Sequence, residues 1–80
     1  MSTEYINFCR EQICFAKKQV EWYSGQIKLC GKIIKQETYD FGLSLYGEMI
    51  KKERNKYYKE RSYWRHKINE YEKKLVSMGA

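Results

Sequence analysis

Proline is absent from this chain of 80 residues, and alanine occurs only twice. Because proline is the residue that breaks helix interiors, its absence leaves long uninterrupted helices possible. Cysteine is scarce and odd in number, with Cys9, Cys14 and Cys30 as the three examples. No two of them have Cys-x-x-Cys spacing, so the sequence predicts neither a disulfide framework nor a zinc site.

Long apolar runs are also missing. No stretch approaches the roughly 18 apolar residues of a membrane-spanning helix. The first residues lack the basic segment followed by an apolar one that marks a secretory signal peptide. We therefore expect a soluble cytoplasmic protein with reduced thiols, either in its own cell or in the cytoplasm of a host.

The residue patterns of common enzymes are not found. His66 is the one histidine, and it has no cysteine or carboxylate at catalytic or metal-ligand spacing. Nothing in the sequence supports a nucleophilic pair of Cys14 with His66. Paired carboxylates in an evident cleft, a glycine-rich phosphate loop and a His-Glu-x-x-His motif are all lacking. The sequence predicts a non-enzymatic protein without catalytic residues, metal, cofactor or small-molecule substrate.

The first half of the chain carries a strong heptad pattern. One row of apolar residues repeats every seven positions, and a second row follows three positions later. The rows are Ile6, Ile13, Val20, Ile27 and Ile34, and Cys9, Ala16, Tyr23 and Cys30. A seam of this kind, sustained over four repeats, is typical of a helix packed along a partner helix. We expect a helix from about residue 3 to about residue 36.

A third row makes the apolar face of this helix unusually wide. Its members are Phe8, Phe15, Trp22 and Leu29, about 160° around the helix from the isoleucine row. One partner helix is not expected to cover so wide a face. Either a second neighbour packs there, or Phe8, Phe15 and Trp22 form a protein interface, to which we add Tyr63 of the second half.

The second half reads as another long helix after a break at about residues 37–44. Asp40 and Ser44 are both plausible N-caps, Gly42 permits a turn with positive φ, and Gly79 is a stop signal. The helix is expected from about residue 45 to about residue 78. Its seam is Leu43, Ile50, Tyr57, Trp64, Tyr71 and Met78, with Ile68 and Leu75 in alternate layers.

Two long helices joined by a short connection predict an all-α fold of one domain over residues 1–80. The helices should lie antiparallel as a helical hairpin related to coiled coils. A single hairpin would leave the third row, that of Phe8, Phe15 and Trp22, exposed to solvent. We therefore expect two hairpins to pair into a symmetric four-helix homodimer, since two-fold symmetry is the commonest closed assembly.

The net charge of +6 arises entirely within residues 51–67, where eight basic residues face two acidic ones. Arg54, Tyr58, Arg61 and Arg65 follow one another at helical spacing and form a stripe beside the seam. Around it lie Lys51, Lys52, Lys56 and Lys59. Guanidinium groups bind phosphates and carboxylates bidentately. The alternative is that these arginines pair with glutamates of the neighbouring helix, with Glu21 near Arg61.

These patterns predict a small regulatory protein that binds RNA or DNA through its phosphate backbone. Arg54, Arg61 and Arg65 would be the anchors, and Tyr58 would stack on a base. The alternative is a protein-binding inhibitor or adaptor that uses the exposed aromatic residues or meets an acidic protein surface. The richness in Lys, Tyr and Ile indicates an AT-rich gene, which would fit a viral accessory protein that antagonises a host enzyme. Membrane binding is the least favoured reading, because the hairpin seam accounts for the apolar face of the second helix.

Overall fold

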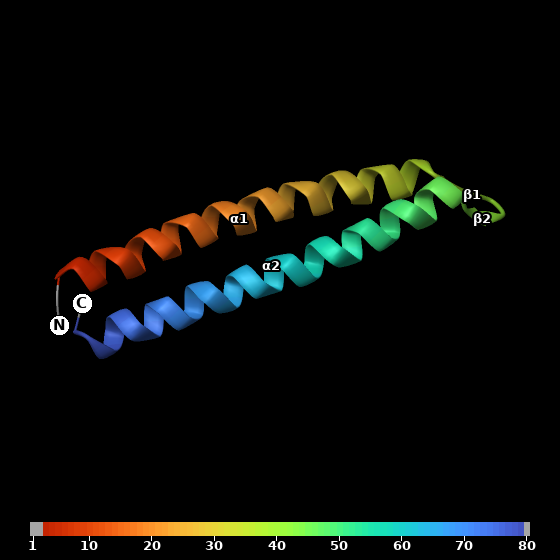
Figure 1. The fold of residues 1–80 in the computed structure, drawn as a ribbon. Coiled ribbons are helices and arrows are strands. Elements are labelled where there is room, and N and C mark those ends of the chain that lie inside the picture. Colours follow the sequence, from red (N-terminus) through yellow and green to blue (C-terminus); the bar gives the residue numbers. More distant parts are fainter. Residues whose placement is uncertain (1–2, 80) are drawn as a thin grey trace.

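The computed structural model describes residues 3–79 and shows two long antiparallel helices lying side by side (Figure 1). Helix α1 spans Thr3–Gln36 and helix α2 spans Leu45–Ser77. The rod measures 60 × 14 × 13 Å along its principal axes. The predicted all-α hairpin is confirmed, and both helices begin where the sequence predicted. Dimerisation stays a prediction.

The connection between the helices contains two very short strands that the sequence did not predict. Strand β1 (Thr38–Tyr39) pairs antiparallel with strand β2 (Gly42–Leu43). Gly42 has a φ of 116°, so the positive φ expected of the turn falls on the residue that tolerates it best. The chain reverses within these few residues, and this brings α2 back along α1.

Ser44 starts α2 and fastens the turn to the end of α1. Its side-chain oxygen accepts a hydrogen bond from the backbone N–H of Gly47 at 3.0 Å, as an N-cap does. Its hydroxyl also donates to the Glu37 carboxylate at 2.8 Å. The hydroxyl of Tyr39 donates to the same carboxylate oxygen at 3.2 Å, and the charge of Glu37 raises the pKa of Tyr39. Ser44, and not Asp40, is therefore the cap.

The end of α2 matches the predicted stop signal. The N–H of Met78 bonds the carbonyls of Lys74 and Leu75, and Gly79 has a φ of 72°. A glycine with positive φ directly after the last turn is a common way to end a helix.

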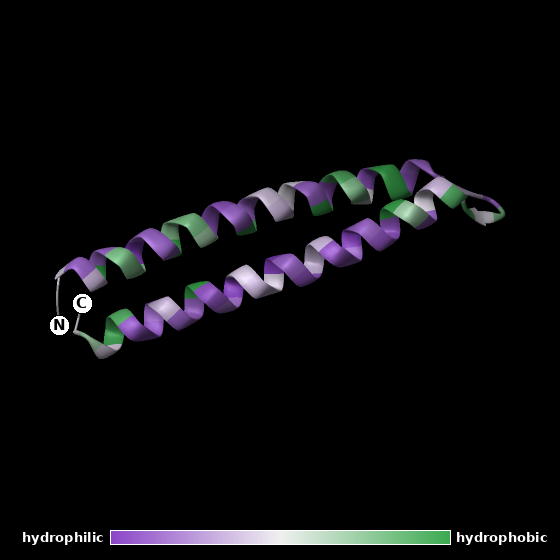
Figure 2. Cartoon of the chain, in the orientation of Figure 1, coloured by the Kyte–Doolittle hydropathy of each residue, from purple (hydrophilic) through white to green (hydrophobic). Residues whose placement is uncertain are grey.

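The core is thin and follows the predicted seam of α1. The buried apolar residues in the described part of the chain are Cys9, Ile13, Ala16 and Cys30. The remaining seam members of both helices are half-buried. Figure 2 shows the same asymmetry, with apolar bands recurring along α1 and a mostly hydrophilic middle of α2. A core this small gives a modest stability for 80 residues.

Gly47 and Gly25 differ in how much space surrounds them. A Cβ added at Gly47 would lie 2.8 Å from Cγ of Leu43 and 3.1 Å from Cβ of Glu37, whereas a Cβ at Gly25 meets nothing within 4 Å. We predict that Gly25→Ala raises the free energy of unfolding by about 0.5–1 kcal/mol through helix propensity. Gly47→Ala should lower it by about 1–2 kcal/mol, because Leu43 must move. Urea denaturation followed by circular dichroism measures both, and equal gains would contradict the close packing at the turn.

Candidate binding surfaces

Ring contacts fix how the two helices meet on one side of the hairpin. The pairs Phe8–Tyr71, Phe15–Trp64 and Trp22–Tyr57 have ring centroids 6.2, 5.4 and 6.0 Å apart. Each step of seven residues forward along α1 is a step of seven residues back along α2. The same register therefore persists through three heptads of an antiparallel pair.

The rings of the α1 row remain half open to solvent. Phe8, Phe15, Trp22 and Leu29 are between 45% and 53% exposed. Tyr63 of α2 is exposed to the same degree and packs edge-on against Trp64, with ring centroids 5.1 Å apart. We refer to these five residues, Phe8, Phe15, Trp22, Leu29 and Tyr63, as the aromatic face. All four residues predicted as a protein interface belong to it.

The structure explains why α2 reaches this row at all. The most buried row of α1 is that of Cys9 and Ala16, and Phe8 and Phe15 each precede a member of it by one residue. One residue is about 100° of helix rotation, so the rings lie at the border of the interface. Large rings can bridge that angle. The expectation that one partner helix cannot fully cover this row is therefore correct. Helix α2 covers about half of each side chain, and the other half stays exposed.

The arginines lie along the other side of the hairpin. The Nη1 group of Arg61 donates to the hydroxyl of Ser24 at 3.2 Å. Ser24 follows Trp22 by two residues, which is about 200° of helix rotation, so the two side chains point to opposite sides of α1. We refer to Arg54, Tyr58, Arg61 and Arg65 as the arginine edge.

Tyr58 stands between two guanidinium groups on this edge. The central guanidinium carbons of Arg54 and Arg61 lie 5.9 and 5.3 Å from the centroid of its ring. Both arginines are half-buried, Tyr58 is 41% exposed, and Arg65 is exposed. Cation–π contacts at this range are attractive and limit where the two arginine head groups point.

Arg54 and Arg61 lie closer to the seam than the sequence suggested. They belong to a row of α2, spaced by seven residues, that also contains Gly47, Ile68 and Leu75. We expected them beside the seam, and the structure places them in one of its half-buried rows. Ser24 opposes Arg61. This small residue leaves room for the stem of Arg61, whose charged end can then reach solvent.

Among residues 3–79, no carboxylate forms an ion pair with an arginine of the edge. Within residues 3–79 the ion pairs are Lys56–Glu53 at 3.4 Å and Lys67–Glu70 at 3.5 Å, and neither contains an arginine. Glu21 was the expected partner of Arg61, but the contact that Arg61 makes is the one with Ser24. Arg54 keeps its Nε atom buried without a hydrogen-bond partner. The guanidinium groups of the edge therefore carry no compensating carboxylate within the described residues.

Lys51, Lys52 and Lys59 of the predicted lysine field lie around this edge on the surface of α2, whereas Lys56 lies one heptad before Tyr63, on the side of the aromatic face. Lys51, Lys52, Lys56 and Lys59 are all exposed. Lys56 makes an exposed i,i+3 pair with Glu53, and pairs of this kind contribute little. The four ammonium groups add a diffuse positive potential to the arginines.

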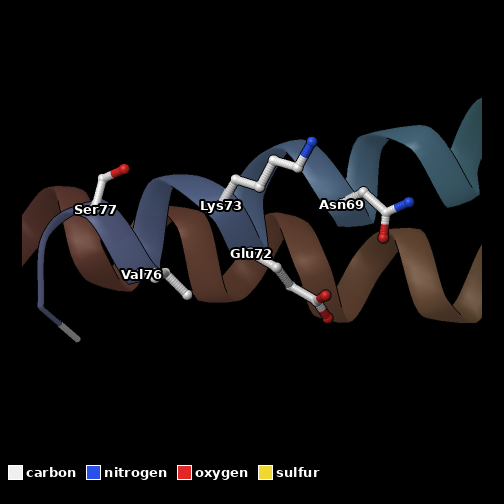
Figure 3. Close-up of a pocket in the computed structure, with 5 residues that line it drawn as sticks. All are labelled: Asn69, Glu72, Lys73, Val76 and Ser77. Atoms are coloured by element: carbon white, nitrogen blue, oxygen red, sulfur yellow. The ribbon is translucent and has the colours of Figure 1, made fainter.

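Other parts of the surface show fewer features of a binding site. Figure 3 shows a shallow hollow on the outside of α2, lined by exposed side chains of that one helix. They are Asn69, Glu72, Lys73, Val76 and Ser77. Among residues 3–79, no cluster of three His, Cys, Asp or Glu side chains has the arrangement to hold a metal ion. Within the same residues, no helix is long and apolar enough to cross a membrane.

The chain matches no protein-family model, no curated protein and no solved structure in the three comparisons made. Its function is therefore argued from the two surfaces. Sequence reasoning missed Tyr46 and Met49, which are exposed and continue the aromatic face toward the turn. The sequence could have indicated Met49, because this residue precedes Tyr63 by two heptads.

Proposed function

We propose that this protein is a small non-enzymatic regulator that binds RNA or DNA through the phosphate backbone, with the arginine edge as its contact surface. The observation that carries the proposal is the row of three guanidinium groups without a carboxylate partner in residues 3–79. Arginine forks match phosphate oxygens bidentately. A phosphate strand would supply the anions that residues 3–79 do not.

The dimensions of the edge fit contact with several phosphates. At 1.5 Å per residue, Arg54 and Arg65 are separated by about 16 Å along α2. Lys51 and Lys52 extend the positive surface past Arg54 toward the turn, and Lys56 and Lys59 lie within its length on other faces of the helix. Contacts of this kind position a nucleic acid without reading its bases. We therefore propose binding with little sequence preference and strong salt dependence.

Tyr58 receives a different role from the one that the sequence suggested. Its ring already contacts the guanidinium groups of Arg54 and Arg61. We assign it the positioning of those two arginines in place of stacking on a base. Holding flexible side chains near their bound geometry reduces the entropy lost on binding.

We further propose that the protein acts as a homodimer in which the aromatic face is covered. The many exposed apolar side chains of this hairpin favour a binding partner or an oligomer. The competing function is that of an inhibitor or adaptor that binds an acidic protein, such as a host enzyme targeted by a viral accessory protein. It is supported by the same aromatic face, and the binding experiment separates the two.

The proposal predicts a large loss of nucleic-acid binding in the variant Arg54→Ala/Arg61→Ala/Arg65→Ala. If each contact contributes at least about 1 kcal/mol, the dissociation constant rises about 100-fold at low salt. The slope of log affinity against log salt should fall by about 2 to 3, close to one unit for each lost phosphate contact. Fluorescence anisotropy with mixed-sequence RNA and DNA oligonucleotides at several salt concentrations measures both quantities.

Two matched variants control this experiment. Lys18→Ala/Lys28→Ala/Lys32→Ala removes the same charge from exposed positions of α1, and we expect it to weaken binding less than tenfold. Arg54→Lys/Arg61→Lys/Arg65→Lys keeps the charge and loses the planar forks, so we expect an intermediate loss. Absence of wild-type binding at low salt would reject the proposal and favour an acidic protein as the target.

A further inference from the structure

The aromatic face is a continuous surface formed by both helices. Phe15 contacts Trp64, and Trp64 contacts Tyr63, so rings from α1 and α2 meet on one side of the rod. Tyr46 and Met49 extend this surface toward the turn, where both side chains are exposed. A hairpin with four buried apolar residues among residues 3–79 gains a larger share of its stability from covering such a face than a protein with a full core would.

The exposed rings supply about half of the area that a dimer needs. A large aromatic side chain has about 200 Å² to bury, so each half-exposed ring of the face retains roughly 100 Å². Phe8, Phe15, Trp22 and Tyr63 together offer about 400 Å² per chain on that basis. A standard interface buries about 800 Å² per partner. The residues between the rings, including the charged ones, supply the rest of the contact.

A charged row runs along the α2 side of this face and changes sign halfway. Its members, seven residues apart, are Glu53, Glu60, Lys67 and Lys74. The row borders the rings, because the Nζ atom of Lys67 lies 5.6 Å from the Tyr63 ring centroid and that of Lys74 lies 5.0 Å from the Tyr71 ring centroid. Within this row the half nearer the turn is acidic and the half nearer the chain ends is basic, although Glu53 and Lys67 each also make an exposed pair within the chain, with Lys56 and Glu70.

Because one half of the row is acidic and the other half is basic, two copies of the row have complementary charges when they lie antiparallel. If a two-fold axis crosses the rod near residues 63 and 64, Glu53 faces Lys74 of a second copy and Glu60 faces its Lys67. Two-fold symmetry repeats both pairs, which gives four ion pairs around the rings. If the rods instead lay parallel, the α2 row would face the uncharged row of Gln12, Gln19 and Gln26 on the other α1. Charge complementarity therefore favours the antiparallel arrangement.

We propose that a second copy of this chain covers the aromatic face, with the two α2 helices antiparallel across the two-fold axis. This arrangement rests on the homodimer proposed above and defines its geometry. Arg61 and the rings point to opposite sides of the hairpin, so both arginine edges remain on the outside of the dimer. The dimer presents two anion-binding edges on opposite faces.

Charge reversal in the two halves of the row tests the arrangement. The variants Glu53→Lys/Glu60→Lys and Lys67→Glu/Lys74→Glu each turn the four attractive pairs of a homodimer into repulsive ones. We expect the dimer dissociation constant of each to rise about 100-fold at low salt relative to wild type. Mixed together, the basic row of one variant faces the acidic row of the other, so we expect a heterodimer with near wild-type affinity. Sedimentation equilibrium and native mass spectrometry measure both results, and circular dichroism shows that the helices are retained.

A symmetric disulfide supplies an independent measurement that does not need the reversed charges. Tyr63→Cys places a thiol close to the axis and next to its symmetry mate, in a Cys14→Ser background that removes the exposed native thiol. With a mild added oxidant we expect a rapid intermolecular disulfide. The matched variant Asn55→Cys, on an exposed position away from the face, should form it at least tenfold more slowly.

The outcomes distinguish this geometry from the function proposed above. A wild-type chain that stays monomeric at high micromolar concentration overturns the dimer altogether. A wild-type dimer whose reversed variants also dimerise, and do not prefer each other in the mixture, overturns the antiparallel arrangement. Neither result bears on nucleic-acid binding, which the anisotropy experiment measures separately through the arginine edge.

Discussion

Ala16→Glu is expected to unfold most of the hairpin. Ala16 is 1% exposed and lies in the seam of α1, in the row that is most deeply covered by α2. The new carboxylate would be buried or would force the helices apart, at a cost of about 4 kcal/mol or more. A domain of 80 residues has a total stability of about 4–12 kcal/mol. We expect a large loss of ellipticity at 222 nm at 25 °C, or a fall in the melting temperature of more than 20 °C.

The matched control is Lys18→Glu, which introduces the same side chain two residues further on, at an exposed position of the same helix. Surface substitutions usually change stability by less than about 0.5 kcal/mol, so its thermal transition should stay near that of the wild type. A cooperative transition for Ala16→Glu within 1 kcal/mol of wild type would mean that α1 and α2 do not close over this row.

The hairpin itself could be predicted from the sequence because its determinants are local and periodic. The heptads of α1 contain Ile13 and Ala16 at the positions that prove buried. The break was recognisable because Gly42 and Ser44 are residues with specific backbone roles, and both roles are confirmed. The two short strands were missed, since four residues are too few to show any alternation of apolar and polar side chains.

The position of the arginine edge was predicted only in part. Helical spacing correctly placed Arg54, Tyr58 and Arg61 on one side of α2. It could not show that two arginines occupy a seam row, because a heptad pattern leads one to expect apolar residues there. The contact of Arg61 with Ser24 on α1 depends on the register between the helices.

The aromatic face illustrates a similar difference between local pattern and packing. The seven-residue spacing of Phe8, Phe15 and Trp22 was plain in the sequence. Their half-burial against rings of α2 depends on which row of α1 becomes the centre of the interface, and Cys9 and Ala16 are small enough to let the helices approach there. Small residues at the centre and large rings at the border together decide how much apolar surface is left for a second copy.

The variant Phe15→Gln/Trp22→Gln is expected to abolish dimerisation at micromolar concentrations. Both rings are half exposed at the middle of the aromatic face, where contacts that dominate binding usually gather. If each contributes at least about 2 kcal/mol to association, the dissociation constant rises about 1000-fold. Glutamine suits the exchange because Gln12 and Gln19 already occupy neighbouring positions of this helix. Sedimentation velocity over a hundredfold range of concentration measures the change.

Loss of ring contacts within the hairpin is the other effect of this variant, since Phe15 also packs on Trp64 and Trp22 on Tyr57. The measurement is therefore made at a temperature at which circular dichroism shows full helicity.

Phe41→Gln/Leu45→Gln is the matched control, because it removes two more exposed apolar side chains that lie off the aromatic face. It should dimerise like the wild type. Equal weakening by the two variants would show that the chains associate through non-specific apolar contact, since only an ordered interface distinguishes rings at its centre from equally apolar residues elsewhere on the surface.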